Sequence, residues 1–391
     1  MSLHDTVVAQ EYPITIGIAT ASREKEEIYR LRYQIYVEEM AMQLTSVDHS
    51  NSLLYDQLDK WAILIYAKAG PKTIGTIRIN IGPLSKFPPD LVQILSLNRF
   101  QKFYKENNQQ SFFAYSSKLM VDPYYRNTAA LHLLTAKAYE LGCGQVQFCF
   151  GVCNFHLLRL YEQIGWRRLD RSFTAPGYDG VLIPLVLLID DIEYFRAVRS
   201  PLYRIARKRG LLNTCAAGWF REEFTEHSNT MNSQLVTEEE LWAFLRKRLR
   251  HEPNLTIRVL DRLSAAEARQ FLHYCGIIIQ CRAGDYITLC GYTSHTLGIL
   301  ITGRLSPGFA GSEADTILPG HCFGTAGLVG QPRYTEDIYA VTDTEILIIS
   351  RLSFHKFQHS HPDIALKIIQ NIETFTDEQI RTNQATKIRL K

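Results

Sequence analysis

The sequence lacks the features that would place it among membrane, disulfide-rich or nucleic-acid-binding proteins. No uninterrupted apolar run reaches the roughly 18 residues of a membrane-spanning helix, and no secretory hydrophobic segment opens the chain. The eight cysteines include no CxxC pair, so neither a disulfide framework nor a zinc site is expected. A net charge of +3 is too small to indicate nucleic-acid binding by itself. We expect a cytoplasmic protein with reduced thiols, no transmembrane segment, no metal and no nucleic-acid partner.

What the chain does have is an ordinary globular composition and a length that suits two domains. It has 391 residues, of which 46% are hydrophobic and 21% charged. Strands alternate with helices up to about residue 190, and a charged helical stretch follows. Short strands with glycine-rich turns make up the remainder. We therefore predict an α/β (α+β) domain with a mixed sheet over 12–190, a basic helical linker over 191–252 and an all-β domain with flanking helices over 253–391.

The first informative stretch, between Ser116 and Leu134, reads as a strand, a tight basic loop and a helix. The apolar residues before Pro123 suit a buried strand, which the proline ends because it cannot donate to a sheet ladder. Residues 129–141 are strong helix formers with an apolar stripe. Backbone N–H groups at the start of this helix, with Arg126 beside them, form an anion site suited to a pyrophosphate or to the phosphate of phosphopantetheine.

This stretch resembles motif A of the GNAT acyltransferases, a V-x-P-x-x-R run that holds the pantetheine pyrophosphate. Val121, Pro123 and Arg126 fit the run, whereas Ala129 and Leu131 stand where the family has small residues. The resemblance implies acyl-CoA or an acyl carrier protein as donor, and the single phosphate of a carrier protein tolerates the lost glycine better. The donor-binding residues that it implies are Met120, Val121, Arg126, Asn127, Thr128, Ala129 and Ala130.

A second stretch, Cys153 to Arg167, resembles GNAT motif B, in which an asparagine precedes a helix that carries L-Y-E-x-x-G-F. Asn154 and Tyr161 stand at the family spacing, and Gly165 suits the helix stop. The resemblance implies that the Tyr161 hydroxyl protonates the departing thiolate. The alternative is a core tyrosine that packs the helix on the sheet. Two motifs in this order are more specific than either alone, and they imply a GNAT fold.

The front half resembles the acyl-homoserine lactone synthases, with an arginine and an aromatic four residues on, then D-x-x-D, then G-x-x-R. Tyr115 and Lys118 replace that family's final acidic and arginine positions, so the sister family of long-chain N-acyl amino acid synthases fits better. The resemblance covers about residues 12–190. It implies Asp56 and Asp59 as the groups that hold the acceptor ammonium and take its proton. The acceptor-binding residues that it implies are Arg32, Arg78, Ser117, Lys118 and Asn154.

Each of these charged residues has a plainer interpretation. Asp56 and Asp59 suit a solvated loop pair, and an arginine within a strand, such as Arg78, is usually solvated. The basic run from Asp190 to Gly210 suits docking of an acidic acyl carrier protein or an anionic membrane surface. It equally suits a solvated helix face.

The all-β part has the rhythm of a jelly roll and resembles the cyclic nucleotide-binding domain over about 253–375. Gly324 and Arg333 match that family's phosphate cassette, but Thr325 replaces its ribose-binding glutamate. The nearby carboxylates Glu336 and Asp337 are expected to pair with Arg333. A structural or dimerising barrel is favoured over a cyclic nucleotide site, and no DNA-binding helix-turn-helix is expected after the last helix, predicted over 364–380.

These features together favour an N-acyltransferase that moves a fatty acyl group from a thioester to an amine. The acceptor is expected to be an amino acid, a small amine or a lysine- or ornithine-like side chain of a peptide, as in lipopeptides. One alternative is a cyclic-nucleotide-responsive sensor whose GNAT-like half is not catalytic. Another is an autoinducer synthase that makes acyl-homoserine lactones.

Overall fold

The computed structural model describes residues 12–44, 46–169, 172–174, 180–210, 214–224, 232–308, 316–330 and 333–374. Three expectations from the sequence fall wholly or partly outside them: a loose end over 1–12, a polar connector over 226–234 and the part of the last helix beyond residue 374. Within the described part, no helix combines the length and the apolar character needed to cross a bilayer.

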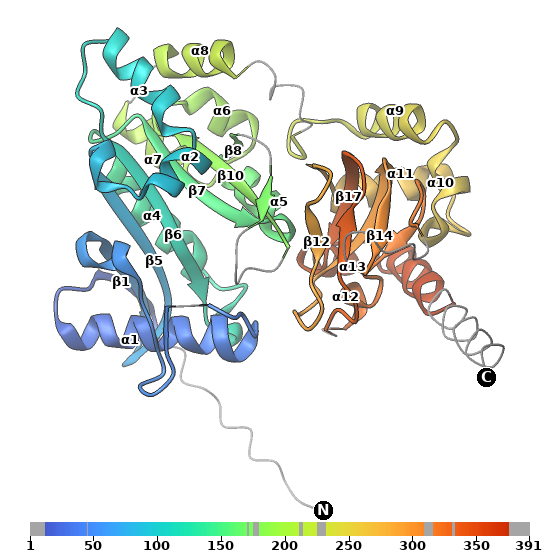
Figure 1. The fold of residues 1–391 in the computed structure, drawn as a ribbon, viewed down its shortest axis with the longest axis horizontal. Coiled ribbons are helices and arrows are strands. Elements are labelled where there is room, and N and C mark those ends of the chain that lie inside the picture. The colour runs from blue at the N-terminus through green and yellow to red at the C-terminus, as the bar shows by residue number, and fades with distance from the viewer. Residues whose placement is uncertain are drawn as a thin grey trace, which may run out of the picture.

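The predicted mixed sheet is confirmed as an eight-stranded sheet in the N-terminal half (Figure 1). Its order is β1-β4-β5-β6-β7-β10-β8, with β9 also paired to β10. All pairs are antiparallel except β6 with β7. The strands are β1 (Ile14–Ile18), β4 (Ile63–Ala69), β5 (Lys72–Gly82), β6 (Phe113–Val121), β7 (Phe148–Asn154), β8 (Arg167–Arg168), β9 (Phe173–Thr174) and β10 (Val181–Leu188). A small hairpin, β2 (Val47–Asp48) with β3 (Leu53–Leu54), lies apart from it.

The parallel pair β6–β7 separates soon after it forms. Ala114 and Tyr115 pair with Cys149 and Phe150, and these are the pairs that join the two strands. Beyond them β6 runs on to Val121 and β7 to Asn154 without pairing with each other. The sheet is therefore split between two adjacent strands beyond Tyr115 and Phe150.

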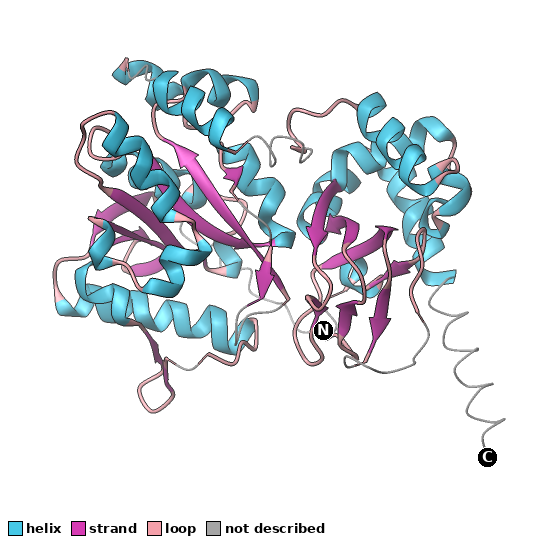
Figure 2. Ribbon diagram, turned by 45° about the horizontal axis from the view of Figure 1, so that its top comes forward, coloured by secondary structure: helices cyan, strands magenta, loops and turns pink. Residues whose placement is uncertain are grey.

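Helices cover both faces of this sheet (Figure 2). On one face, the isoleucines of β5 pack against α4. On the same face, a neighbouring cluster of buried side chains includes Phe195 of α6 and Leu202 of the α6–α7 turn. The other face carries α1, the π-helix η1 and an aromatic cluster from α3 and α8. The N-terminal helices are α1 (Ser22–Tyr33), η1 (Gln34–Glu39), α2 (Pro89–Ile94), α3 (Leu97–Glu106), α4 (Ala130–Gly142), α5 (Leu158–Ile164), α6 (Ile192–Ala197), α7 (Tyr203–Arg209) and α8 (Thr214–Glu223). Short 3₁₀ turns are η2 (Gln57–Trp61), η3 (Leu84–Lys86), η4 (Pro123–Tyr125) and η5 (Phe155–Leu157).

The C-terminal half is a β-sandwich with helices on its outer side, as the glycine-rich texture predicts. One sheet has the order β11-β17-β13-β15 and the other β12-β16-β14. Ile277 and Ile279 of the first sheet share a core with Ile287 and Ile338 of the second. The strands are β11 (Gly276–Cys281), β12 (Tyr286–Thr288), β13 (Thr296–Thr302), β14 (Leu305–Pro307), β15 (Cys322–Phe323), β16 (Ile338–Ala340) and β17 (Thr344–Ser350). The helices are α9 (Glu238–Leu249), α10 (Pro253–Thr256), η6 (Arg258–Leu260), α11 (Ala265–Cys275), α12 (Ala326–Val329), α13 (Arg351–Ser360) and residues 362–374.

The two halves meet along β11, which is an edge strand of its sheet. Three alternate carbonyls of β11 accept hydrogen bonds from side chains of the first half. Arg159 donates to Gly276 O at 3.2 Å, Arg168 to Ile278 O at 2.5 Å, and Ser172 to Gln280 O at 2.8 Å. An edge strand exposes unpaired backbone groups that favour association, and these contacts satisfy them within the chain.

Candidate active site

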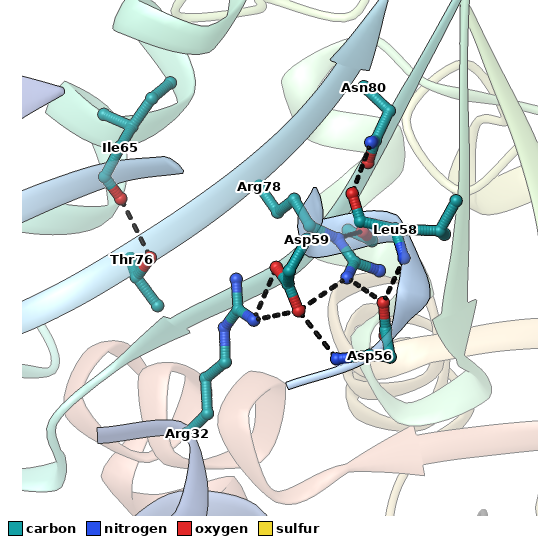
Figure 3. Close-up of polar contacts among 9 residues, drawn as sticks. Arg32, Asp56, Leu58, Asp59, Ile65, Thr76, Arg78 and Asn80 are labelled. Atoms are coloured by element: carbon teal, nitrogen blue, oxygen red, sulfur yellow. Dashed lines mark hydrogen bonds and ion pairs between the residues drawn. The ribbon is translucent and has the colours of Figure 1, made fainter. Parts of the chain in front are cut away.

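Four charged side chains predicted from scattered motifs meet on the α1 face of the sheet (Figure 3). Arg32 of α1 contacts both oxygens of Asp59, at 2.9 and 3.0 Å. Arg78 of β5 contacts Asp56 at 2.5 Å and Asp59 at 3.1 Å. Asp59 therefore lies between two guanidinium groups, and the four residues form one ion-pair network.

The D-x-x-D spacing has a local cause. Asp56 is the N-cap of η2, and its carboxylate accepts from Leu58 N at 2.9 Å. Asp59 reaches back to accept from Asp56 N at 2.9 Å, which completes a capping box. This turn holds both carboxylates on one side, and Arg32 and Arg78 approach them there.

Burial contradicts the plainer interpretations of these residues. The side chains of Arg32, Arg78 and Asp59 are 0%, 2% and 3% exposed, so neither a solvated strand arginine nor a solvated loop pair is correct. Burial alone raises the pKa of Asp56, but Arg78 and Lys118 outweigh it and hold that pKa below its usual value. The network is charged and enclosed.

Lys118 joins this network through an irregularity of β6. The register with β5 shifts between Thr76 and Arg78, and Lys118 has a φ of +55°. Ser117 and Lys118 therefore face the same side, because Ser117 accepts from Arg78 Nε at 2.9 Å and Lys118 Nζ lies 4.9 Å from the ring centroid of Tyr36. Burial, followed by the charge of Arg78, lowers the pKa of Lys118 to about 8.

Some polar atoms beside the network lack hydrogen-bond partners among the described residues. They are Arg32 Nε and Nη2 and Asn80 Oδ1, and both side chains are 0% exposed. Asn80 is a residue that the sequence interpretation missed. The sequence pattern that could have indicated it is the presence of polar residues at every second position of β5, namely Thr76, Arg78 and Asn80. Buried polar groups without partners are costly, and they are found where a ligand can satisfy them.

The opposite face of the split holds a narrow apolar cavity of about 30 Å³. Ser116 and Leu119 of β6 and Cys149 of β7 line it from the sheet, and α4 and α5 cover it. Among its other walls are Ile77, Ile79, Ala138, Gly142, Trp166 and Leu202. Its apolar walls suit a lipid chain, and its small volume means that a long chain requires the walls to move apart.

Tyr161 of α5 lines this cavity and is half-buried. Its ring lies 5.9 Å from that of Trp166. Burial is the main cause that raises its pKa, and Cys153, Tyr36 and Tyr115 raise it further. Tyr36 and Tyr115 lie toward the charged network, so Tyr161 is near the gap that joins the two faces.

The helix that carries Tyr161 is held from three directions. The side chain of Glu162 is 1% exposed and accepts from Arg168 Nε at 2.8 Å. Ser233, within the predicted linker, donates to Glu162 from its backbone N–H and its hydroxyl, at 3.1 and 2.6 Å. Arg159, two residues before Tyr161, contacts β11. The C-terminal half thus touches the segment on which the candidate acid lies.

The donor motif differs from the expectation in its partners. Arg126 forms a two-point ion pair with Glu39 of η1, at 2.6 and 2.7 Å. The N–H of Ala130, which was expected to face a phosphate, donates to the Thr128 hydroxyl at 3.3 Å. Asn127 has a φ of +72° and Ala129 is the N-cap residue of α4. A phosphate at this loop therefore has to compete with Glu39 for Arg126.

The remaining donor and acceptor residues lie around the split. Met120 and Val121 are buried near the end of β6. Asn154 occupies the N-cap position of η5, at the end of β7. No group of three or more histidine, cysteine, aspartate or glutamate side chains in the described ranges is placed to hold a metal ion.

The candidate nucleotide residues lie at one end of the barrel. Gly324 has a φ of +66°, and Thr325 immediately precedes the short helix α12. Arg333 donates to Gly291 O at 2.9 Å. The expected pairing of Arg333 with Glu336 or Asp337 does not occur among the described contacts, and Asp337 accepts from Cys290 N at 2.7 Å instead.

One family model matches part of the chain. Residues 27–189 match the family model of the N-acyl amino acid synthase FeeM. No curated protein matches the chain. Among solved structures, FeeM itself, an N-acyl amino acid synthase from uncultured soil microbes, is 13% identical with a TM-score of 0.39, covering 49% of this chain and 98% of that one.

Two further solved structures are similar. TofI, in a ternary complex with an inhibitor and MTA, is 15% identical with a TM-score of 0.35, covering 48% of this chain and 96% of that one. A cyclic nucleotide-binding domain from Methylobacillus flagellatus is 14% identical with a TM-score of 0.32, covering 38% of this chain and 85% of that one.

Proposed function

We propose that the protein joins a fatty acyl group to the amino group of an amino acid, because residues 27–189 match the family model of the N-acyl amino acid synthase FeeM. The donor is a phosphopantetheine thioester, carried by coenzyme A or by an acyl carrier protein. The observation that supports this most is the split between β6 and β7. It has an ion-pair network on one face of the sheet and an apolar cavity with Tyr161 on the other.

The charge of the network favours an acceptor that carries a carboxylate. Arg32 and Arg78 supply two positive charges against the two negative charges of Asp56 and Asp59, and Lys118 adds a further positive charge once it has taken the acceptor's proton. An acceptor carboxylate neutralises the remaining positive charge and gives the unpartnered donors of Arg32 an acceptor. Asn80 Oδ1 is suited to the acceptor's ammonium or amine hydrogens.

The reaction needs a base for the acceptor ammonium, and Lys118 suits that role better than the two aspartates. Arg78 and Lys118 hold the pKa of Asp56 below its usual value and make it a weak base, and both oxygens of Asp59 are occupied by Arg32 while Arg78 contacts one of them. With its pKa lowered to about 8, Lys118 loses its own proton as the pH rises through about 8 and then accepts one from the acceptor. We assign to the aspartates the task of holding Arg32 and Arg78, and to Lys118 that of proton acceptor.

The leaving group needs a proton, and Tyr161 supplies it in this proposal. Lys118 first takes one proton from the acceptor ammonium, and the free amine nitrogen attacks the thioester carbonyl. The C–N bond forms, the C–S bond breaks, and the departing thiolate takes a proton from the Tyr161 hydroxyl. The second proton, which the nitrogen loses as it becomes an amide, returns to the Tyr161 oxygen, and Lys118 releases its proton to solvent. Burial keeps Tyr161 protonated, and it also raises the pKa of a thiol in the same region, as for Cys149, to about 12.

The test is product analysis with acyl thioesters of several chain lengths. The protein is incubated with acyl-pantetheine, acyl-CoA or acyl carrier protein and a panel of amino acids, amines and lysine- or ornithine-containing peptides. Mass spectrometry detects the amide, and a thiol reagent measures the released pantetheine. We expect N-acyl amino acid and thiol in equal amounts. A thiol signal without any amide, or no turnover with any donor, contradicts the proposal.

The role of the C-terminal half is also part of this proposal. We assign it a structural role, because β11 contacts the segments around Tyr161 and Arg333 is bound to a backbone carbonyl. The divisions near residues 190 and 252, and the formation of a homodimer, stay predictions.

A further inference from the structure

The C-terminal barrel reaches the donor side of the split sheet through a pair of histidines. His156 lies on η5, the turn between β7 and α5, and its ring centroid is 4.9 Å from that of His295, with 37° between the ring planes. His295 directly precedes β13 of the barrel, and η5 packs against β17 of the same sheet. The barrel therefore contacts the catalytic half between the split strand β7 and the helix that carries Tyr161.

The donor loop also meets the barrel at His295. Burial is the main cause that lowers the pKa of His295; the charge of Glu39 opposes it, and the charges of Arg126 and Arg351 lower that pKa further. Burial, followed by the neighbouring His295, holds the pKa of His156 well below its usual value. Both imidazoles are therefore neutral near neutral pH, and each has one N–H group to donate.

Arg351, the first residue of α13, brings a guanidinium group to this place from the barrel. Its backbone N–H donates to His295 O at 2.9 Å, which fixes the two residues beside each other. Its Nη1 is shielded from solvent and has no hydrogen-bond partner among the described residues. A buried donor of a charged group is costly to leave unsatisfied, so this atom suits an anionic ligand.

The charges around His295 have a positive excess. Arg126 and Arg351 supply two positive charges, and Glu39 supplies one negative charge, which is bound to Arg126 at 2.6 and 2.7 Å. The side chain of Arg126 is 43% exposed and that of Glu39 28%, so a competing anion can reach this pair. The phosphate of a pantetheine arm has the charge and the several acceptor oxygens that two guanidinium groups bind.

We propose that Arg351 and His295 of the barrel bind the phosphate of the pantetheine donor together with Arg126 of the donor motif. The phosphate takes the place of Glu39 at Arg126. The C-terminal half then has a binding role in addition to its structural one. The inference rests on the proposed acyl transfer, and it adds to the donor site two residues outside the matched range 27–189.

The experiment measures the binding of phosphopantetheine and of pantetheine, which differ by the phosphate alone, to the full-length protein by titration calorimetry. The ratio of the two Kd values is the phosphate preference. We expect Arg351→Gln and Arg126→Gln each to lower this preference about tenfold, because each removes a charge-assisted hydrogen bond. Arg351→Lys retains part of it. Glu39→Gln raises the affinity for phosphopantetheine, because it frees Arg126 from its carboxylate partner.

The matched control is Arg304→Gln. Arg304 is exposed and follows the other end of β13, a strand of seven residues. A strand of that length spans about 20 Å, so Arg304 is remote from His295. Arg304→Gln is therefore expected to keep the wild-type preference. Coenzyme A and the holo form of an acyl carrier protein carry the same phosphate, and a loss of affinity for either in Arg351→Gln supports the inference and identifies the donor.

Two results overturn the inference: a wild-type phosphate preference in Arg351→Gln, and an equal fall in Arg304→Gln. If Arg351 only stabilises the contact between the halves, Arg351→Gln unfolds more easily but keeps the preference, because an unfolded fraction removes sites without changing the ratio of the Kd values. Absence of amide from every acyl thioester in the wild type is a separate result. It contradicts the acyl transfer, whereas the binding measurement needs no turnover.

Discussion

Replacing Asp59 by asparagine tests the charged network most severely. Asp59 accepts from Arg32 at 2.9 and 3.0 Å and from the Asp56 N–H at 2.9 Å, and it contacts Arg78 at 3.1 Å. Its side chain is 3% exposed, so water cannot replace the lost charge. Removing one partner of a buried ion pair leaves an uncompensated charge and costs about 3–5 kcal/mol. That is a large part of the about 5–15 kcal/mol by which native domains are stable.

Asp56→Asn provides the matched comparison. Its side chain is 28% exposed and it contacts only one arginine, so we expect a loss of about 1–2 kcal/mol. Adding Arg32→Met to Asp59→Asn removes the orphaned cation and should recover part of the loss. The assay is denaturant unfolding followed by tryptophan fluorescence. Equal losses for Asp56→Asn and Asp59→Asn, or a further loss on adding Arg32→Met, refute the reasoning.

Three further predictions concern the base, the barrel contacts and the nucleotide cassette. If Lys118 must be neutral to take the acceptor's proton, kcat/KM rises with pH through about 8. The variant Lys118→Arg removes this rise and lowers kcat at least tenfold. A pH profile that is the same in Lys118→Arg and in the wild type excludes this role. Arg168 and Ser172 both contact carbonyls of β11, but of the two Arg168 also binds Glu162, the residue next to Tyr161. We therefore expect Arg168→Ala to lower kcat more than Ser172→Ala does. Equal kcat values for the two variants in steady-state kinetics contradict this. We expect titration calorimetry with cyclic AMP and cyclic GMP to detect no binding, because Arg333 is bound to Gly291 O and Thr325 replaces an acidic residue. Binding of either nucleotide that Arg333→Ala abolishes contradicts this prediction.

Local patterns predicted the parts of the site that local physics determines. The D-x-x-D pair is a capping box, which needs only its own four residues, and its geometry follows from its spacing. The order of strand, loop and helix around Pro123 and Asn154 follows in the same way from proline and cap preferences. The structure keeps this order, with β6 ending at Val121 just before Pro123 and β7 ending at Asn154.

Long-range packing determines the features of the site that could not be predicted from the sequence. Arg78 was interpreted as solvated because the alternation of residues in one strand does not reveal which face of the sheet a helix covers. In the structure, α1 covers the face on which Arg78 lies. Glu39 reaches Arg126 across 87 positions, so no local pattern indicates that pair. The aromatic helix α3 was missed because its Phe100 and Phe103 find their partners on β7 and α8, far along the chain. The contacts of β11 require the relative placement of two separately predicted halves.

The central claim is that acyl transfer takes place at the split strands with Tyr161 as the proton donor. The direct measurement is kcat for amide formation from acyl-pantetheine by the wild type and by Tyr161→Phe, with unfolding curves recorded for both. The account predicts that kcat falls about 10²-fold or more, while KM for the amino acid and the stability change little. Wild-type kcat in a folded Tyr161→Phe variant contradicts it.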